Sequence, residues 1–140
     1  MKIVLFFMLM NISNMGVKPD LKGKTFEAEV QATCKTMSDG GCMIYTYCVL
    51  KFEEDKVTVS HPVKAVCTPK EREANYAHLD NNETKQYKWF VNSKQEITIE
   101  GFADYGNLIW KNNKLIGNTE KNGKPTAIEF SEQSVNKKSS

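Results

Sequence analysis

The 140-residue sequence predicts an all-β, mainly antiparallel fold, an up-and-down barrel of about eight strands with one short helix. Two observations support this prediction. Apolar and polar residues alternate along several short runs, which is typical of half-buried strands. Turn-forming Asn, Asp, Ser and Gly residues follow at intervals of about ten residues in the second half, which is the spacing of an antiparallel meander. About eight such strands can close around an interior that holds side chains or one small ligand.

The chain opens with Lys2 and an apolar run over 3–10, a pattern typical of a secretory signal peptide. The run would span about 12 Å as a helix, far less than the roughly 30 Å hydrocarbon core of a bilayer, so it predicts no membrane span. We therefore expect a signal peptide over 1–16 and a secreted or periplasmic protein. The alternative is a first buried strand.

The remaining residues, about 120 in number, suit one domain. We expect a single β-barrel domain over 17–133. Residues 134–140 contain no apolar residue after Val135 that could anchor them and predict a flexible tail.

The first half of the domain predicts strands at 24–32, 44–52, 57–60 and 63–67, with turns at 37–41 and 53–56. One face of the first strand carries Phe26, Ala28, Val30 and Ala32. The face of the second strand that we expect to point inward carries Ile44, Thr46, Cys48, Leu50 and Phe52. Pro62 interrupts the pattern because proline cannot donate a hydrogen bond to a sheet.

A short helix is predicted over 69–78. Thr68 can cap it, Pro69 suits its first position, and Glu71 can complete a capping box. One hypothesis places this helix over an end of the barrel. Further strands are expected at 86–91, 96–100, 107–111, 114–117 and 126–131.

Four cysteines in a chain that we expect to be exported predict two disulfides. They are Cys34, Cys42, Cys48 and Cys67. Three pairings are possible, and the turn at 37–41 favours Cys34–Cys42 with Cys48–Cys67. A zinc site is disfavoured because the spacings contain no Cys-x-x-Cys pair. If the chain is not exported, free buried thiols become the better interpretation. We predict no metal and no cofactor.

The net charge of +2 is too small to indicate nucleic acid or an anionic membrane as a partner. Arg72 is the sole arginine, which disfavours bidentate recognition of phosphate. The only histidines are His61 and His78, and no catalytic motif is present, so we do not expect an enzyme.

Aromatic residues are numerous for a domain of this length. Those considered for a site are Tyr45, Tyr47, Tyr87, Trp89 and Trp110. They can pack in the core, line a cavity or form an exposed patch. The cavity hypothesis assigns six residues to ligand binding: Phe26, Val30, Leu50, Trp89, Ile99 and Trp110.

The order of strands resembles the lipocalin or calycin type of barrel over most of 21–133. The segment Gly23-Lys24-Thr25-Phe26 is similar to the Gly-x-Trp opening of that family, with Thr25 at the tryptophan position and an aromatic residue one place later. The runs 108–117 and 127–130 are similar to its final hairpins. The resemblance implies a cup-shaped binding protein and does not identify a ligand.

Two functions follow as hypotheses. The preferred one is a secreted, non-enzymatic, lipocalin-like protein that binds a small apolar or amphipathic molecule. The alternative is a protein-binding inhibitor or immunity-type module whose interior is filled with side chains. The direction of the bulky residues discriminates between them, because inward-pointing rings leave little room for a ligand.

Overall fold

The computed structural model of the protein describes residues 19–134, so the predicted signal peptide and nearly all of the predicted tail lie outside the described residues. The elements, in chain order, are β1 (Thr25–Met37), β2 (Gly40–Phe52), β3 (Lys56–Ser60), β4 (Val63–Thr68), the 3-10 helix η1 (Lys70–Leu79), β5 (Thr84–Val91), β6 (Ile97–Ile99), β7 (Ile109–Lys111), β8 (Lys114–Lys121) and β9 (Lys124–Glu132).

Eight of these strands form a nearly closed antiparallel barrel, which confirms the predicted fold class. Hydrogen-bonded neighbours follow the order β6-β5-β3-β2-β1-β9-β8-β7. The two ends of this order meet where Ile97 pairs with Leu108, the residue before β7. The Ile97 N–H donates to the Leu108 carbonyl at 2.7 Å, and the Leu108 N–H donates back at 2.8 Å.

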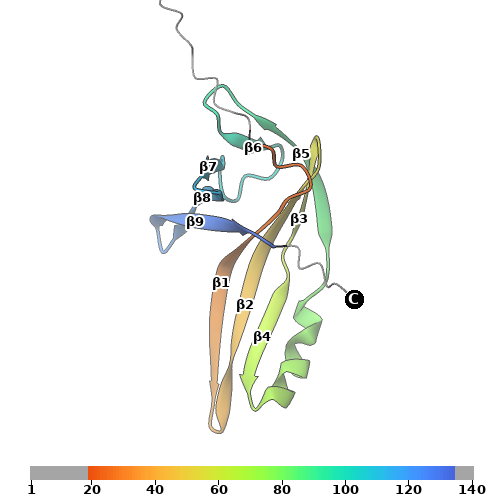
Figure 1. The fold of residues 1–140 in the computed structure, drawn as a ribbon. Coiled ribbons are helices and arrows are strands. Elements are labelled where there is room, and N and C mark those ends of the chain that lie inside the picture. The colour runs from red at the N-terminus through yellow and green to blue at the C-terminus, as the bar shows by residue number, and fades with distance from the viewer. Residues whose placement is uncertain (1–18, 135–140) are drawn as a thin grey trace, which may run out of the picture.

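Strands β1 and β2 are thirteen residues long and extend well beyond the barrel (Figure 1). Their far halves, residues 31–37 and 40–46, continue as a sheet whose third strand is β4. The helix η1 lies beside β4. We call residues 31–46 together with β4 and η1 the arm.

A β-bulge divides β1 into a barrel half and an arm half. The register with β2 shifts by one residue between Glu29 and Gln31, so Val30 is the extra residue. Before the bulge, Phe26 and Ala28 point inward as predicted. Beyond it the faces exchange, and Ala32 pairs with Tyr45 on the outer face. The prediction that Ala32 shares the inward face was therefore wrong, because one added residue reverses every side chain that follows.

The barrel core holds 17 buried residues from nearly every strand. The inward face that we predicted for β2 is confirmed over its barrel half, since Cys48, Leu50 and Phe52 are at most 1 % exposed. Val57 and Val59 of β3 continue this core beside them.

The short helix is confirmed, but not its cap or its place. It begins at Lys70, after Pro69, and no side chain caps its first turn. None of its residues is buried, and it lies along the arm instead of over an end of the barrel (Figure 1). Arg72 forms an ion pair with Asp39 in the β1–β2 turn, and the Lys35 ammonium lies 5.3 Å from the centre of the Tyr76 ring.

The predicted disulfide pairing was wrong. The structure joins Cys42 to Cys67 and leaves Cys34 and Cys48 as free thiols. Cys34 pairs with Met43, one residue from the predicted partner, and so lies on the opposite face from Cys42. Cys48 lies six residues farther along β2 than Cys42, about 20 Å away, and cannot reach Cys67.

Candidate functional site

The six residues predicted to bind a ligand come together in one place. Phe26, Leu50, Trp89 and Ile99 belong to the buried core, and Val30 and Trp110 are partly buried against it. They meet as packed side chains. Phe26 contacts Trp110 edge to face, with ring centres 5.7 Å apart, so the ring that would line a cavity fills the interior.

The aromatic rings of the barrel form two contact series. In the first, Phe52 contacts Phe26 at 5.8 Å and Trp89 at 5.2 Å, both edge to face. In the second, Tyr105 contacts Phe102 at 5.8 Å and Phe130 at 5.5 Å between ring centres. These are favourable geometries for aromatic packing and explain why these rings lie in the barrel core.

Cys48 contributes a buried thiol to this interior, a group that is a nucleophile when it is deprotonated. Burial raises its pKa to about 12, although the hydrogen bond to Tyr105 opposes the rise. Burial likewise raises the pKa of Tyr105. Both groups are therefore neutral at physiological pH, and a neutral, fully buried thiol is not a nucleophile.

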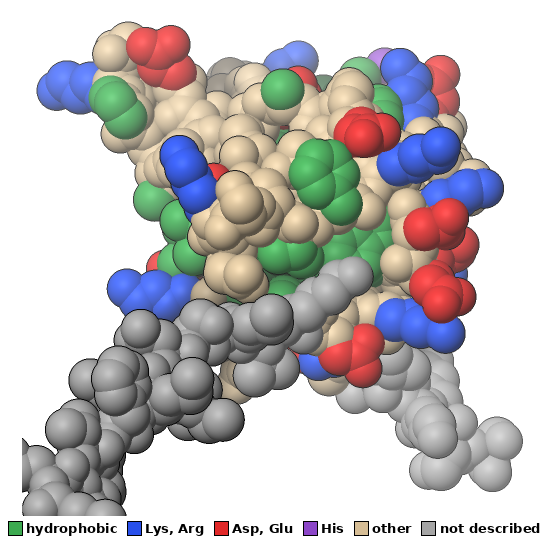
Figure 2. All heavy atoms as spheres, turned by 90° about the horizontal axis from the view of Figure 1, so that it is seen from above, with side chains coloured by type: hydrophobic (Ala, Val, Ile, Leu, Met, Phe, Trp, Pro, Cys, Tyr) green, Lys and Arg blue, Asp and Glu red, His purple; other side chains and the backbone are tan. Residues whose placement is uncertain are grey.

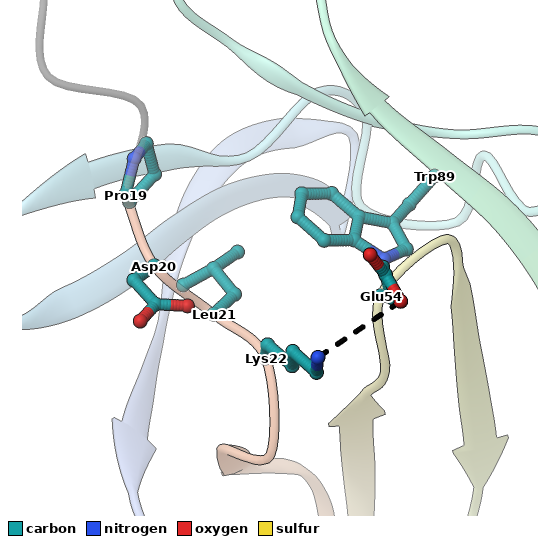
Figure 3. A pocket seen from close by; sticks show the side chains of 6 residues that line it. All are labelled: Pro19, Asp20, Leu21, Lys22, Glu54 and Trp89. Atoms are coloured by element: carbon teal, nitrogen blue, oxygen red, sulfur yellow. Dashed lines mark ion pairs between the residues drawn. The ribbon is translucent and has the colours of Figure 1, made fainter.

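One end of the barrel is closed by the segment before β1. Leu21 is 1 % exposed, and its side chain points toward the indole of Trp89 (Figure 3). The Trp89 Nε1–H donates to the Glu53 carbonyl at 3.0 Å. Lys22 and Glu54 face each other across the entrance, 3.9 Å apart. An open depression remains at this entrance, lined by Pro19, Asp20, Leu21, Lys22, Glu54 and Trp89.

Seen from above, Figure 2 shows hydrophobic side chains in the middle of the visible face and charged side chains mostly around its margin. A second depression lies where β3 and β5 meet the segment after β6. It is lined by Val59, His61, Glu83, Lys85, Tyr87, Gly101, Phe102 and Asp104. This surface mixes both signs of charge with aromatic rings. Within residues 19–134, no three His, Cys, Asp or Glu side chains are grouped so as to hold a metal ion.

The outer face of the arm differs from these depressions because it is broad and carries few charges. Its side chains come from three adjacent strands and form cross-strand rows. Met43 lies between Cys34 and Val66, and Tyr45 lies between Ala32 and Lys64. Val66 is 48 % exposed. We call Cys34, Met43, Tyr45, Tyr47 and Val66 the outer patch.

Two glycines and an ion pair shape this part of the arm. A side chain on Gly40 would overlap the Thr68 carbonyl oxygen, and one on Gly41 would approach the Lys35 carbonyl at 2.7 Å. The three strands therefore pack closely at the end of the arm. The Arg72 guanidinium holds the pKa of Asp39 below its ordinary value, chiefly through a hydrogen bond.

The ring of Tyr47 extends the outer patch toward the barrel, 6.5 Å from that of Tyr45. Partial burial raises the Tyr47 pKa, and the carboxylates of Glu29 and Glu27 add to the rise. Its hydroxyl thus remains a hydrogen-bond donor at neutral pH. Tyr and Met are residue types enriched in protein interfaces, where charged residues are depleted.

An exposed patch at Tyr45 and Tyr47 was one of the possibilities predicted from the sequence, whereas Met43, Val66 and Cys34 were not predicted to belong to it. The signal was weak, because the run 33–37 was not included in the first strand. The alternation of apolar and polar residues stops at the adjacent polar pair Lys35 and Thr36, both of which are compatible with an edge strand.

Between residues 19 and 134, no helix has the length and apolar character needed to cross a membrane. Comparison of the chain with protein-family models, with curated proteins and with solved structures finds no match.

Proposed function

We propose that the protein is an exported, non-enzymatic module that binds another protein through the outer patch of its arm. The observation that carries this proposal is the filled interior. The bulky residues predicted to line a cavity point inward and contact one another, which is the arrangement expected of the protein-binding alternative.

A small apolar ligand would have to displace packed side chains. Phe26, Leu50 and Phe52 are at most 1 % exposed, and Leu21 closes the end near Trp89. Removing such side chains from their contacts costs several kcal/mol, roughly the whole stability margin of a small domain. The lipocalin resemblance therefore stays a prediction about architecture, and we do not extend it to cavity binding.

The outer patch supports the proposal from the surface side. It combines exposed Val66 with partly exposed Met43, Tyr45 and Tyr47 on a three-stranded sheet. A contiguous apolar face of this kind marks an interaction site more often than a solitary exposed residue does. Lys64 and Glu29 lie at its border and would lie in the polar rim of an interface.

Export is part of the proposal, and the disulfide supports it. Cys42–Cys67 closes a 25-residue separation in the arm, and such bonds persist mainly in oxidising compartments. The apolar run at 3–10 agrees with export. Mass spectrometry of the protein from its exporting host, after alkylation of the unfolded, unreduced chain, should show loss of the signal peptide, one disulfide and two alkylated thiols.

Site-specific photo-cross-linking tests the proposed interface. A benzophenone amino acid replaces Val66 in one variant and Phe90 in the other. Phe90 is a matched control, because it is an exposed apolar residue of a barrel strand, 43 % exposed against 48 % for Val66. We expect a discrete adduct from position 66 in the secreted or periplasmic fraction, and none from position 90.

The cross-linked protein is then identified, purified and titrated against the native chain. Val66→Glu should weaken its binding at least about tenfold by placing a charge in the apolar contact, and Phe90→Glu should not. Equal adducts from both positions, or unchanged binding of Val66→Glu, would refute the interface. A stoichiometric small molecule in native mass spectra would instead favour the cavity hypothesis.

A further inference from the structure

The arm half of β1 has an unpaired edge. β9 pairs with β1 only at Phe26 and Glu27, and among residues 19–134 no other strand lies along this edge beyond them. Figure 1 shows β1 as the outermost strand of the arm, whereas η1 lies beside β4 at the other edge. Between the bulge at Val30 and the turn at Ser38, residues 31–37 form a regular strand with this edge free.

The direction of the backbone groups follows from two hydrogen bonds of β2. The Tyr47 N–H donates to the Pro62 carbonyl at 2.9 Å, on the β4 side, and the Phe52 N–H donates to the Lys24 carbonyl at 3.0 Å, on the β1 side. Successive residues of a strand alternate in this direction. Even-numbered residues of β2 therefore bond to β1.

The β1 partners of those residues are Gln31, Thr33 and Lys35. The remaining residues of the segment, Ala32, Cys34 and Thr36, consequently point their N–H and C=O groups at the free edge. These three positions are symmetric about Cys34, the midpoint of the segment.

We propose that two copies of the chain pair antiparallel through this edge, with the two-fold axis at Cys34. In this register Cys34 lies opposite Cys34 of the second copy, and Ala32 lies opposite Thr36. Every outward N–H of the segment then meets an outward C=O, which satisfies the backbone of both edges. The two arms become one continuous sheet.

The side chains are compatible with this register. Lys35 is the sole charged residue of the segment, and its cross-strand partner is Thr33, so the two lysines do not meet. Lys35 also points to the inner face, over the ring of Tyr76. Long exposed edges are usually protected by charges, proline or bulges, and of these the segment 31–37 carries one charge, that of Lys35.

Charge complementarity at the ends of the segment favours a second copy over an arbitrary extended peptide. A notch lies beside the bulge, lined by Val30, Gln31, Ala32, Lys121 and Asn122. The proposed register brings the partner's turn, Ser38–Asp39, to this notch. The exposed carboxylate of Asp39 would then approach the ammonium group of Lys121, once at each end of the two-fold pair.

The first test compares two substitutions at one position by analytical ultracentrifugation of the full chain. Cys34→Pro removes the outward N–H at the axis, and an edge strand tolerates proline there because that N–H has no partner in the part of the monomer that the structure describes. Cys34→Ser removes only the thiol. We expect Cys34→Ser to dimerise like the native chain and Cys34→Pro to dimerise at least about tenfold more weakly.

A register test needs no proline and covers the case in which Cys34→Pro fails to fold. In a Cys34→Ser background, Ala32→Cys and Thr36→Cys proteins are treated with a short bifunctional thiol reagent, separately and mixed. We expect covalent dimers only in the mixture, because identical positions would lie about 14 Å apart along the paired strands. Cys48 is buried and remains unreacted.

Monomer at all concentrations for native and Cys34→Ser proteins would overturn the proposal. So would equal dimerisation of a folded Cys34→Pro, or cross-linking of the Ala32→Cys or the Thr36→Cys protein with itself. The inference does not depend on the proposed function. Val66→Glu, two strands from the edge, should leave dimerisation unchanged whatever it does to a partner protein.

Discussion

Cys48 and Tyr105 show how burial defines chemistry at the level of single residues. Both lie in the barrel core and share a hydrogen bond. Their pKa values are raised mainly because an anion would lose its hydration there. The same cysteine on the surface would be reactive, as we expect for Cys34.

The raised pKa of Cys48 makes stability fall at alkaline pH. The unfolded thiol loses its proton near pH 9.0, whereas the folded thiol keeps it to about pH 12. The unfolded state therefore binds fewer protons in this window, and the free energy of unfolding should decrease by about 1.4 kcal/mol per pH unit. Below pH 9 this contribution is fully present.

Urea unfolding of native and Cys48→Ala proteins between pH 8 and pH 10 measures this effect. The difference in unfolding free energy between the two should shrink above pH 9. The window ends at pH 10 because unfolded Tyr105 begins to ionise there. A constant difference would show that Cys48 titrates alike in both states.

Gly40 gives a second prediction at this scale. It has φ +138° and lies against the Thr68 carbonyl, so Gly40→Ala should lower the unfolding free energy by about 2 kcal/mol or more. Gly106→Ala is the control, since φ is also positive but no atom lies within 4 Å of the new Cβ. Its cost should be about 1 kcal/mol. Chemical denaturation compares the two, and equal costs would contradict a close contact at Gly40.

At the scale of elements, the register of β2 explains the disulfide. β3 pairs with β2 in the register that sets Phe52 opposite Val57. After the interruption at His61 and Pro62, β4 pairs with β2 in the same register. That register places Cys67 opposite Cys42. The sequence contained this information, because the turn at 53–56 was predicted, but the proline was interpreted as a break in pairing.

The disulfide should stabilise the arm by an amount that grows with the length of the loop that it closes. For a separation of 25 residues the chain-entropy model gives about 3.5 kcal/mol. The double variant Cys42→Ala, Cys67→Ala should lose that amount in equilibrium unfolding. A reductant should lower the stability of the native chain similarly and leave the double variant unchanged. A reductant effect on the double variant would indicate another disulfide.

Most elements could be predicted from the sequence because alternation and turn residues are local signals. The barrel strands, the helix and the inward face of β2 belong to this group. The bulge at Val30 could not be predicted, since no residue type marks it and its effect appears only in the register with β2. The predicted site residues lie together as expected. Whether they pack on one another or line a cavity depends on three-dimensional contacts, which the sequence does not contain.

For the molecule as a whole, the packed aromatic core of the barrel leads to a prediction about ligand binding. Removing one of its rings should create a cavity where the native chain has none. Phe52→Ala removes a ring that contacts both Phe26 and Trp89. We expect a loss of about 3–5 kcal/mol in unfolding free energy and new binding of benzene-sized molecules in the vacated space.

Phe90→Ala provides the comparison because Phe90 is exposed on the outer side of the same barrel. It should change stability by less than about 0.5 kcal/mol and acquire no such binding. Isothermal titration of both variants and the native chain checks this. Binding of benzene by the native chain would contradict a filled core.

The arm and the barrel also differ in which chromophores they contain. Both tryptophans of the chain, Trp89 and Trp110, belong to the barrel, whereas Tyr45 and Tyr76 lie in the arm. Indole fluorescence therefore reports on the barrel alone. The near-ultraviolet ellipticity of the disulfide and the tyrosines also reports on the arm. If heating shifts the ellipticity before the fluorescence, the arm melts as a separate unit, and its binding could be lost while the barrel remains intact.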